Sequence, residues 1–411
     1  MIKIFVLTSR IIYPWWNYGM ASIYFLLENL SKKNIKLYLS FPINDIEENF
    51  QSIEQIKHLE ISVFPYNHDT KDNILKLIRN LFQKEPYKIQ KYWNEKYLNY
   101  LMSIIYNIKP DIIQVHTPHM FRYAYEISRV FKIPIILRQQ DIVHLQIESF
   151  KKETHNEILK AIAKWQLKKT IEYEKHIWNL ADRIAFITEQ DYRYAIAKFP
   201  NIAFKSVYIL DGINMKENLY YKNQNKKNAF VFMASDQMPN IISLKWFIKI
   251  WKEIFSQYRI DFEFHVFGNI CKIFENEKLK LQEYNIYLKG FVKDKNKLDE
   301  KIAEYLAFIS PTIQGSGYRT KIYDVLSFGM PVICTEFDYK AISSIFERQK
   351  DIMIFNDAND LRYIIDNIYY NKLDLYKISK NSYDKCKEKL NIDFESAEFI
   401  SIYDSLLNKR I

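Results

Sequence analysis

The chain has 411 residues, of which 48% are hydrophobic and 16% aromatic, and its formal net charge is +10. This length predicts two or three domains, and the apolar content excludes disorder as the main description. The positive charge admits nucleic acid, an anionic membrane surface or an anionic small substrate as partner, and composition does not choose among them.

Cysteine usage and hydropathy bear on the compartment. The three cysteines, an odd number without a CxxC pair, indicate a reducing compartment and no structural zinc. The apolar run between Lys3 and Ser9 is too short for a secretory signal, and no stretch reaches the roughly 18 apolar residues of a membrane span. We therefore expect a cytoplasmic protein that could visit the inner face of the membrane.

The first half of the chain alternates short apolar runs with helical patterns. Helices are expected over 19–33 and 154–180, and the runs, rich in β-branched and aromatic residues, are typical of buried parallel strands. These expected strands are 2–9, 35–41, 59–66, 111–116, 133–139, 183–188 and 206–210. Because strands alternate with helices, residues 1–210 are predicted to form a Rossmann-like, doubly wound domain.

A second series of strands follows a break in this rhythm. Residues 211–228 are polar and rich in Asn and Lys, which predicts a linker. Residues 229–390 are predicted to form a second Rossmann-like domain, and 391–411 a C-terminal helix that could cross back to the first domain. The expected strands are 229–235, 262–268, 286–292, 305–311, 331–335 and 351–355. Two such sheets are expected to face each other across a cleft.

The stretch "QGSGYRTKIYDVLSFGMPVICT", residues 314–335, holds three of the seven glycines. A glycine loop before a helix exposes backbone N–H groups, an arrangement that binds anions. Cations at a helix start are unfavourable by roughly 0.3–1 kcal/mol each, so Arg319 and Lys321 indicate a bound anion such as a diphosphate. Asp324, one turn later, could accept hydrogen bonds from a ribose. The alternative is a tight loop with a Lys321–Asp324 surface pair.

This stretch resembles the donor-site motif of family 4 glycosyltransferases, retaining enzymes of the GT-B fold. In that family Gly-x-Gly-x-Arg-x-Lys-x-x-Glu is followed by Gly-x-Pro-Val. Ser316 stands where a first family Glu often lies, and Asp324 stands at the second. Further segments that resemble the family are 9–33, 173–191, 234–254 and 290–294. The resemblance implies two Rossmann-like domains, of which residues 1–210 bind the acceptor and residues 229–390 bind the donor. It also implies transfer of a sugar from a nucleotide-diphosphate donor, without a bound metal or cofactor.

The resemblance also implies site residues. Arg319 and Lys321 are the implied catalytic cations, together with His116, for which a hydrogen-bonded histidine at a strand end is the alternative. Arg138 and Asp141 are implied to contact the acceptor. The implied donor-binding residues are Gly19, Asp236, Asn240, Phe291, Val292, Gly315, Ser316, Gly317 and Asp324.

We predict a retaining hexosyltransferase that moves a sugar to a glycan or lipid-linked acceptor in cell-envelope polysaccharide assembly. One alternative is a GT-B sugar-nucleotide epimerase, and another is a non-catalytic basic protein that binds membranes or nucleic acid. The basic, aromatic segments 84–98 and 151–178 would suit an anionic bilayer, but a solvated helix face above a core explains them as well. No nucleic-acid-binding module is recognised, so no nucleic acid is expected. A metal site of His116, His119 and Asp141 is not expected, because the spacing matches no zinc signature.

Overall fold

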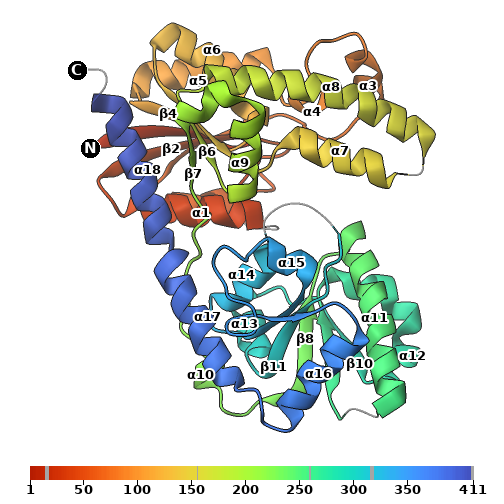
Figure 1. Cartoon of the computed structure of the whole chain (residues 1–411). Coiled ribbons are helices and arrows are strands. Elements are labelled where there is room, and N and C mark those ends of the chain that lie inside the picture. Colours follow the sequence, from red (N-terminus) through yellow and green to blue (C-terminus); the bar gives the residue numbers. More distant parts are fainter. Residues whose placement is uncertain (14–17, 155, 259–260, 315–318, 409–411) are drawn as a thin grey trace. The chain divides into compact units, whose positions relative to one another are not determined.

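The computed structural model describes residues 1–13, 18–154, 156–258, 261–314 and 319–408, which divide into two compact units (Figure 1). Unit 1 comprises Met1–Gly212 and Ile392–Ile411, and unit 2 comprises Ile213–Asn391. Each unit is built on one parallel sheet with helices in the crossovers. The predicted α/β class of two doubly wound domains is therefore confirmed.

The sheet of unit 1 has the order β3-β2-β1-β4-β5-β6-β7, with every pair parallel. Side chains alternate between its faces, so Ile4 and Val6 pack on one side while Phe5 and Leu7 pack on the other. Its strands are β1 (Ile2–Leu7), β2 (Ile35–Ile43), β3 (Ser62–Asn67), β4 (Ile112–Val115), β5 (Ile135–Gln139), β6 (Arg183–Phe186) and β7 (Ser206–Tyr208).

Helices cover both faces of this sheet. The C-terminal helix α18 packs on α1, and its Phe399 and Tyr403 lie in the same core cluster as Ile4. The helices of unit 1 are α1 (Tyr18–Ser31), α2 (Phe50–Lys57), α3 (Ile74–Asn80), α4 (Tyr87–Gln90), α5 (Glu95–Ile108), α6 (Phe121–Phe131), α7 (Val143–Glu153), α8 (Glu157–Leu180), α9 (Glu189–Lys198) and α18 (Ile392–Leu407), with the 3-10 turns η1 (Pro118–Met120) and η2 (Pro200–Lys205).

The sheet of unit 2 has the order β10-β9-β8-β11-β12-β13, again all parallel. Its strands are β8 (Lys227–Met233), β9 (Glu263–Phe267), β10 (Ile286–Gly290), β11 (Tyr305–Ser310), β12 (Val332–Thr335) and β13 (Met353–Phe355). Its helices are α10 (Leu219–Lys222), α11 (Met238–Tyr258), α12 (Lys278–Gln282), α13 (Lys295–Ile302), α14 (Thr320–Leu326), α15 (Glu336–Lys340), α16 (Ala358–Tyr369) and α17 (Leu375–Lys389), with the 3-10 turn η3 (Asn269–Glu277).

The first part of the expected linker 211–228, up to Tyr220, packs on folded elements, whereas most of residues 221–228 are exposed. Tyr220 in α10 is buried, and its hydroxyl donates to the carbonyl of Leu306 at 2.8 Å. Gly329 has φ +84, and a Cβ there would lie 2.1 Å from Oδ1 of Asn218. This contact requires glycine at position 329, at the end of α14.

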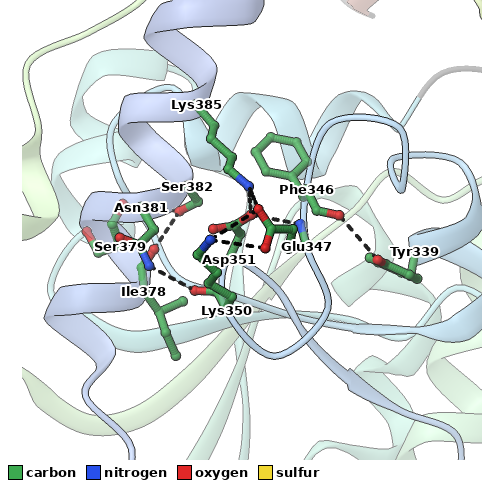
Figure 2. Close-up of polar contacts among 10 residues, drawn as sticks. All are labelled: Tyr339, Phe346, Glu347, Lys350, Asp351, Ile378, Ser379, Asn381, Ser382 and Lys385. Carbon is green, nitrogen blue, oxygen red and sulfur yellow. Dashed lines mark hydrogen bonds and ion pairs between the residues drawn. The ribbon is translucent and has the colours of Figure 1, made fainter.

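A cluster of charges attaches α17 to the loop between β12 and β13 (Figure 2). Asp351 is fully buried and lies 2.5 Å from the ammonium of Lys385, which also contacts Glu347 at 2.6 Å. The amide of Glu347 donates to the Asp351 carboxylate at 2.7 Å, and Asn381 donates to the carbonyl of Lys350 at 3.2 Å. A single lysine of α17 thus neutralises the one buried carboxylate in this set.

Candidate functional site

The topology of unit 2 brings the carboxyl ends of β8 and β11 side by side. On one side of β8 the sheet continues to β9 and β10. On the other side β11 is followed by β12 and β13, so the strand order reverses between β8 and β11. Doubly wound sheets bind ligands at this reversal, outside the carboxyl ends of the strands. The loop after β8 leads into α11, and the loop after β11 leads into α14.

Two predicted residues meet at this point. The ammonium of Lys321, in the first turn of α14, donates to Oδ1 of Asn240 in α11 at 2.5 Å. Asn240 is oriented by its own amide, which donates to the carbonyl and the hydroxyl of Ser235 at 3.1 Å each. Burial lowers the pKa of Lys321 to about 8, with Arg319 adding to this shift and Asp338 opposing it. The ammonium of Lys321 is therefore bonded to a neutral amide, in surroundings that disfavour its protonated form.

Arg319 is oriented by a buried acid. Its Nε lies 2.9 Å from Oδ1 of Asp338, and its guanidinium lies 4.7 Å from the centre of the Phe337 ring. Asp338 is fully buried and accepts a hydrogen bond from Ser310 at 2.5 Å. Burial raises the pKa of Asp338, and Arg319 lowers it. Both carboxylate and ring come from α15, which follows the neighbouring strand β12.

Asp324 has a different partner from the one considered in its sequence context. Its carboxylate lies 2.7 Å from the ammonium of Lys295 in α13, and Lys295 also pairs with the buried Asp299. Burial lowers the pKa of Lys295, but the charges of Asp324 and Asp299 outweigh it, so the net shift is upward. The alternative of a Lys321–Asp324 surface pair is therefore wrong, since Lys321 bonds Asn240 instead.

The other donor-binding predictions lie on loops at the same edge. After β10, Phe291 is exposed and Val292 half-buried, and after β8 Asp236 is exposed. Gly268 holds these loops close together: its amide donates to the carbonyl of Gly290 at 2.8 Å. A Cβ on Gly268, which has φ +105, would lie 2.1 Å from the carbonyl oxygen of Ala234.

Three donor-binding predictions fall outside the described residues: Gly315, Ser316 and Gly317. Of the residues that sequence reasoning missed, Asp338 and Lys295 matter most. The one sequence feature that could have indicated them is their position, because each residue lies a few positions after the end of a strand of the same sheet.

In unit 1, two predicted residues lie inside the domain. Arg138 is fully buried, and one of its guanidinium nitrogens lies 2.5 Å from both Asp211 and Glu395. The other guanidinium nitrogen approaches Nδ1 of His116 at 3.3 Å, while Nε2 of His116 lies 2.8 Å from the amide of Gln114. Burial, and then Arg138, hold the pKa of His116 well below its usual value. The geometry therefore gives Arg138 an internal ion cluster rather than an acceptor contact, and makes His116 a neutral, hydrogen-bonded histidine.

Asp141 and Gly19 lie at the carboxyl edge of the unit 1 sheet. Burial, followed by the charges of Asp191 and Asp211, raises the pKa of Asp141 to about 7. Gln140 donates to the carbonyl of Gly19 at 2.9 Å. The loop after β5 is thereby attached to the start of α1.

Sequence reasoning did not assign a group of cations near this edge to the site. His119 lies half-buried in η1 against the Tyr92 ring, 5.1 Å between centroids. Burial lowers its pKa to about 3, with further contributions from Lys88, Lys91 and Arg10. These side chains come from η1, from α4 and its C-terminal end, and from the loop after β1.

The described part of the chain contains neither a cluster of metal ligands nor a membrane-spanning helix. There, no three His, Cys, Asp or Glu residues are grouped so that they could hold a metal ion. Within the same ranges, no helix is long and apolar enough to span a bilayer.

Comparison with known proteins adds a family and a fold. Residues 227–371 match the family of glycosyl transferases group 1. The match lies within unit 2, so this unit is similar to a group 1 glycosyltransferase domain over most of its length. No curated protein matches the sequence.

Among solved structures, the sucrose-phosphate synthase of Thermosynechococcus elongatus superposes with a TM-score of 0.69 at 12% identity, over 100% of both chains. Anabaena HepE in complex with UDP gives 0.66 at 12% identity, over 98% of this chain and 100% of that one. A variant of S. aureus TarM in complex with fondaparinux, alpha-GlcNAc-glycerol and UDP gives 0.68 at 12% identity, over 98% and 100%. The fold of the chain is the GT-B fold, as predicted.

Proposed function

We propose that the protein is a retaining glycosyltransferase of the GT-B type that transfers a hexosyl group from a UDP-sugar to a glycan or lipid-linked acceptor. The group 1 domain supports the transferase activity. The UDP donor is taken from similar folds, since HepE was solved with UDP and with UDP-glucose. Assembly of cell-envelope polysaccharide is the proposed context, and no metal ion is part of the proposal.

The observation that carries the proposal is the state of Lys321. Its side chain is half-buried, its ammonium donates to the side-chain amide of Asn240, and loss of hydration lowers its pKa to about 8. A partly desolvated cation that is held only by a neutral amide is stabilised when an anion binds, because attraction to the anion replaces the hydration that was lost. Arg319, held in direction by Asp338, supplies a second cation from the same turn.

The proposed mechanism follows from these cations. The bond between the anomeric carbon and the diphosphate oxygen breaks, negative charge develops on that oxygen, and Arg319 and Lys321 stabilise it more strongly than in the ground state. The acceptor oxygen bonds to the anomeric carbon on the same face, and its proton passes to the departing diphosphate. No protein base is needed for this step.

Other residues take supporting roles. We assign Asp324, fixed by Lys295, to the ribose, and the loops of Asp236, Phe291 and Val292 to the base. The acceptor is assigned to the carboxyl edge of unit 1, where Asp141 and the cations around His119 lie. Arg138 and His116 are assigned a structural role beneath this edge, where they connect the ends of β4 and β5 to α18.

The first test is a thermal-shift screen of UDP, GDP, ADP and their sugars with the full chain. UDP is expected to raise the melting temperature, and Lys321→Ala or Arg319→Ala is expected to lower kcat/KM by about 100-fold or more. Lys245→Ala, an exposed lysine on α11, is the matched control. Unchanged turnover in the Arg319→Ala/Lys321→Ala double variant contradicts the proposal. Conversion of the sugar without any acceptor favours the epimerase instead.

A peripheral position on the inner face of the membrane is also part of the proposal. On α3 and just after it, Leu75, Ile78, Leu81 and Phe82 are 70%, 51%, 47% and 91% exposed. The neighbouring α7–α8 pair adds the exposed Phe150, Ile158 and Leu159, and Lys169 of α8 donates to the carbonyl of Asn80 at the end of α3.

Charge supports the same surface. Residues 74–84 contain three basic residues and no acid, and residues 150–168 contain five lysines and two glutamates. Exposed apolar side chains among lysines suit the interface of an anionic bilayer.

The membrane proposal is tested by sedimentation with vesicles of phosphatidylcholine, with and without phosphatidylglycerol. Binding is expected only with the anionic lipid, to weaken with salt, and to be lost in Ile78→Ser/Phe82→Ser. Phe204→Ser is the control, because Phe204 is 82% exposed on η2, outside the proposed surface. Equal binding by the double variant and the wild type contradicts the proposed surface.

A further inference from the structure

One face of the unit 2 sheet carries a groove that is separate from the cations described above. Its volume is about 730 Å³, within the roughly 300–1,000 Å³ of small-molecule sites. Glu263, His265 and Phe267 of β9 line it, together with Tyr305 at the start of β11 and Lys227 at the start of β8. The groove therefore runs along β9, and at one end it reaches Val292, on the loop after β10.

The sheet topology leaves this face open. Side chains alternate along β9, and Phe264 points to the face covered by α11, where its ring lies 4.7 Å from Phe247 and 5.4 Å from Trp251. Glu263, His265 and Phe267 consequently point to the opposite face. Right-handed crossovers put α13, which joins β10 to β11, on that face, and it packs on β11. The groove lies beside α13, whose Lys301 lines it together with the side chains of β9.

Two of the side chains that line the groove, His265 and Tyr305, belong to a row of polar aromatic side chains that continues to Tyr287 on β10. The His265 ring lies 5.2 Å from the Tyr287 ring and 5.1 Å from the Tyr305 ring, edge to face with both. The Tyr305 hydroxyl lies 2.7 Å from Nδ1 of His265, and Nε2 lies 2.6 Å from the Glu263 carboxylate. Burial, with Lys289 adding, lowers the pKa of His265 to about 4, so the ring is neutral. Tyr305 then donates to Nδ1, and Nε2–H donates to Glu263.

The walls have balanced charge. Three lysines, Lys227, Lys289 and Lys301, face three carboxylates, Asp261, Glu263 and Glu304. Lys227 and Glu304 are 2.5 Å apart, and Lys227 also lies 5.2 Å from the centre of the Tyr305 ring. Such a groove selects neither an anion nor a cation, and its charged walls disfavour a purely apolar ligand.

A saccharide satisfies all of these features. Its hydroxyl groups exchange hydrogen bonds with ammonium and carboxylate groups, while the C–H faces of its rings pack on aromatic side chains. We propose that this groove is a second saccharide-binding site, which holds a short neutral segment of a glycan on the donor-binding unit, away from Arg319 and Lys321. The choice of a glycan as the ligand rests on the proposed transferase function. The groove itself and the polar and aromatic residues that line it are independent of that function.

The experiment measures binding directly, without turnover. Maltotriose, cellotriose and chitotriose are titrated into the full chain by isothermal titration calorimetry, and saturation-transfer NMR reports which sugar protons touch the protein. At least one trisaccharide is expected to bind the wild type and to bind at least tenfold more weakly to Glu263→Gln/Lys289→Ala. Lys280→Ala, an exposed lysine of α12 on the helix-covered side, is expected to bind like the wild type.

The outcomes separate this inference from the proposed function. Absence of binding by all three trisaccharides, or equal binding by the double variant, overturns the saccharide site. Binding of inorganic phosphate that is lost in Lys289→Ala overturns it too, because the groove then selects an anion. UDP should raise the melting temperature of the double variant as it does that of the wild type, because the groove is not needed for donor binding. If UDP has no effect on the wild type, that result counts against the transferase proposal and not against the saccharide site.

Discussion

At the scale of single residues, Lys321 is a cation whose protonation depends on what the site holds. With its pKa near 8 in the free protein, about half of the amines are neutral at pH 8. A bound diphosphate favours the ammonium, so it raises the pKa, and UDP binding near pH 8 takes up part of a proton. The affinity for UDP is therefore expected to fall as the pH rises above 8.

Isothermal titration calorimetry at pH 8 in two buffers of different ionisation enthalpy measures this uptake. The apparent enthalpy of UDP binding should differ between the buffers for the wild type and should differ much less for Lys321→Met. A wild-type enthalpy that is independent of the buffer contradicts the assignment of Lys321 to the diphosphate. Lys245→Met serves as the control, since Lys245 is exposed on α11.

Two glycines at the carboxyl edge of the unit 2 sheet, Gly268 and Gly290, both have positive φ but differ in the space around them. Gly268→Ala puts a Cβ 2.1 Å from a carbonyl oxygen at φ +105, whereas Gly290→Ala at φ +76 meets nothing within 4 Å. We expect Gly290→Ala to cost about 1–2 kcal/mol from backbone strain alone, and Gly268→Ala to cost more because its loops must separate. Urea unfolding compares the two. Equal stabilities would mean that the loops do not require the close approach at Gly268.

Residue identities were easier to predict than residue contacts. Glycine scarcity and charges at a helix start led to Arg319, Lys321 and Asp324, and the family resemblance added Asn240. Their partners Asp338 and Lys295 come from other crossovers of the sheet, so no local spacing marks them. Arg138 was misjudged because burial depends on Asp211 and Glu395, which lie 73 and 257 residues further along the chain.

At the scale of elements, continuous apolar runs were sufficient to find the strands. Each expected strand is present within a few residues of its predicted bounds, because a parallel strand buried on both faces needs apolar residues throughout. The segment 211–228 was harder, because its polar residues are used in packing: Asn218 meets Gly329, and Tyr220 is buried. Composition alone does not distinguish such a segment from a solvated one.

The attachment of α17 gives a prediction at this scale. Lys385 neutralises the buried Asp351, so Lys385→Ala leaves a buried carboxylate without its cation (Figure 2). We expect a loss of about 3 kcal/mol or more in unfolding free energy. Lys350→Ala removes only an exposed pair with Glu347 and should cost less than about 1 kcal/mol. Urea unfolding of both variants tests this ranking, and a cost for Lys385→Ala no larger than for Lys350→Ala contradicts it.

At the scale of the whole molecule, buried titratable groups set the dependence of stability on pH. Burial lowers the pKa of His119 to about 3 and of His265 to about 4, so these groups cost stability as the pH falls below the usual histidine value. Burial raises the pKa of Asp141 to about 7 and of Glu395 to about 8, so these carboxyls cost stability as the pH rises from their usual values. Between about pH 4.5 and 6.5 the two effects oppose each other.

Above pH 6.5 the two histidines are neutral in both the folded and the unfolded state, so they no longer change the stability. Only the ionisation of the buried carboxyls still lowers it as the pH rises. Stability is therefore expected to fall between pH 6.5 and 8, by at most about 2 kcal/mol from Glu395, because its ionisation adds a second negative charge beside Asp211 around the single Arg138. Glu395→Gln removes this ionisation, so its melting temperature should decline less steeply over that range, whatever its absolute value. Glu398→Gln, an exposed position on the same helix, should keep the wild-type slope. Parallel slopes for Glu395→Gln and the wild type would mean that Glu395 is already ionised at pH 6.5, with Arg138 balancing both of its acids.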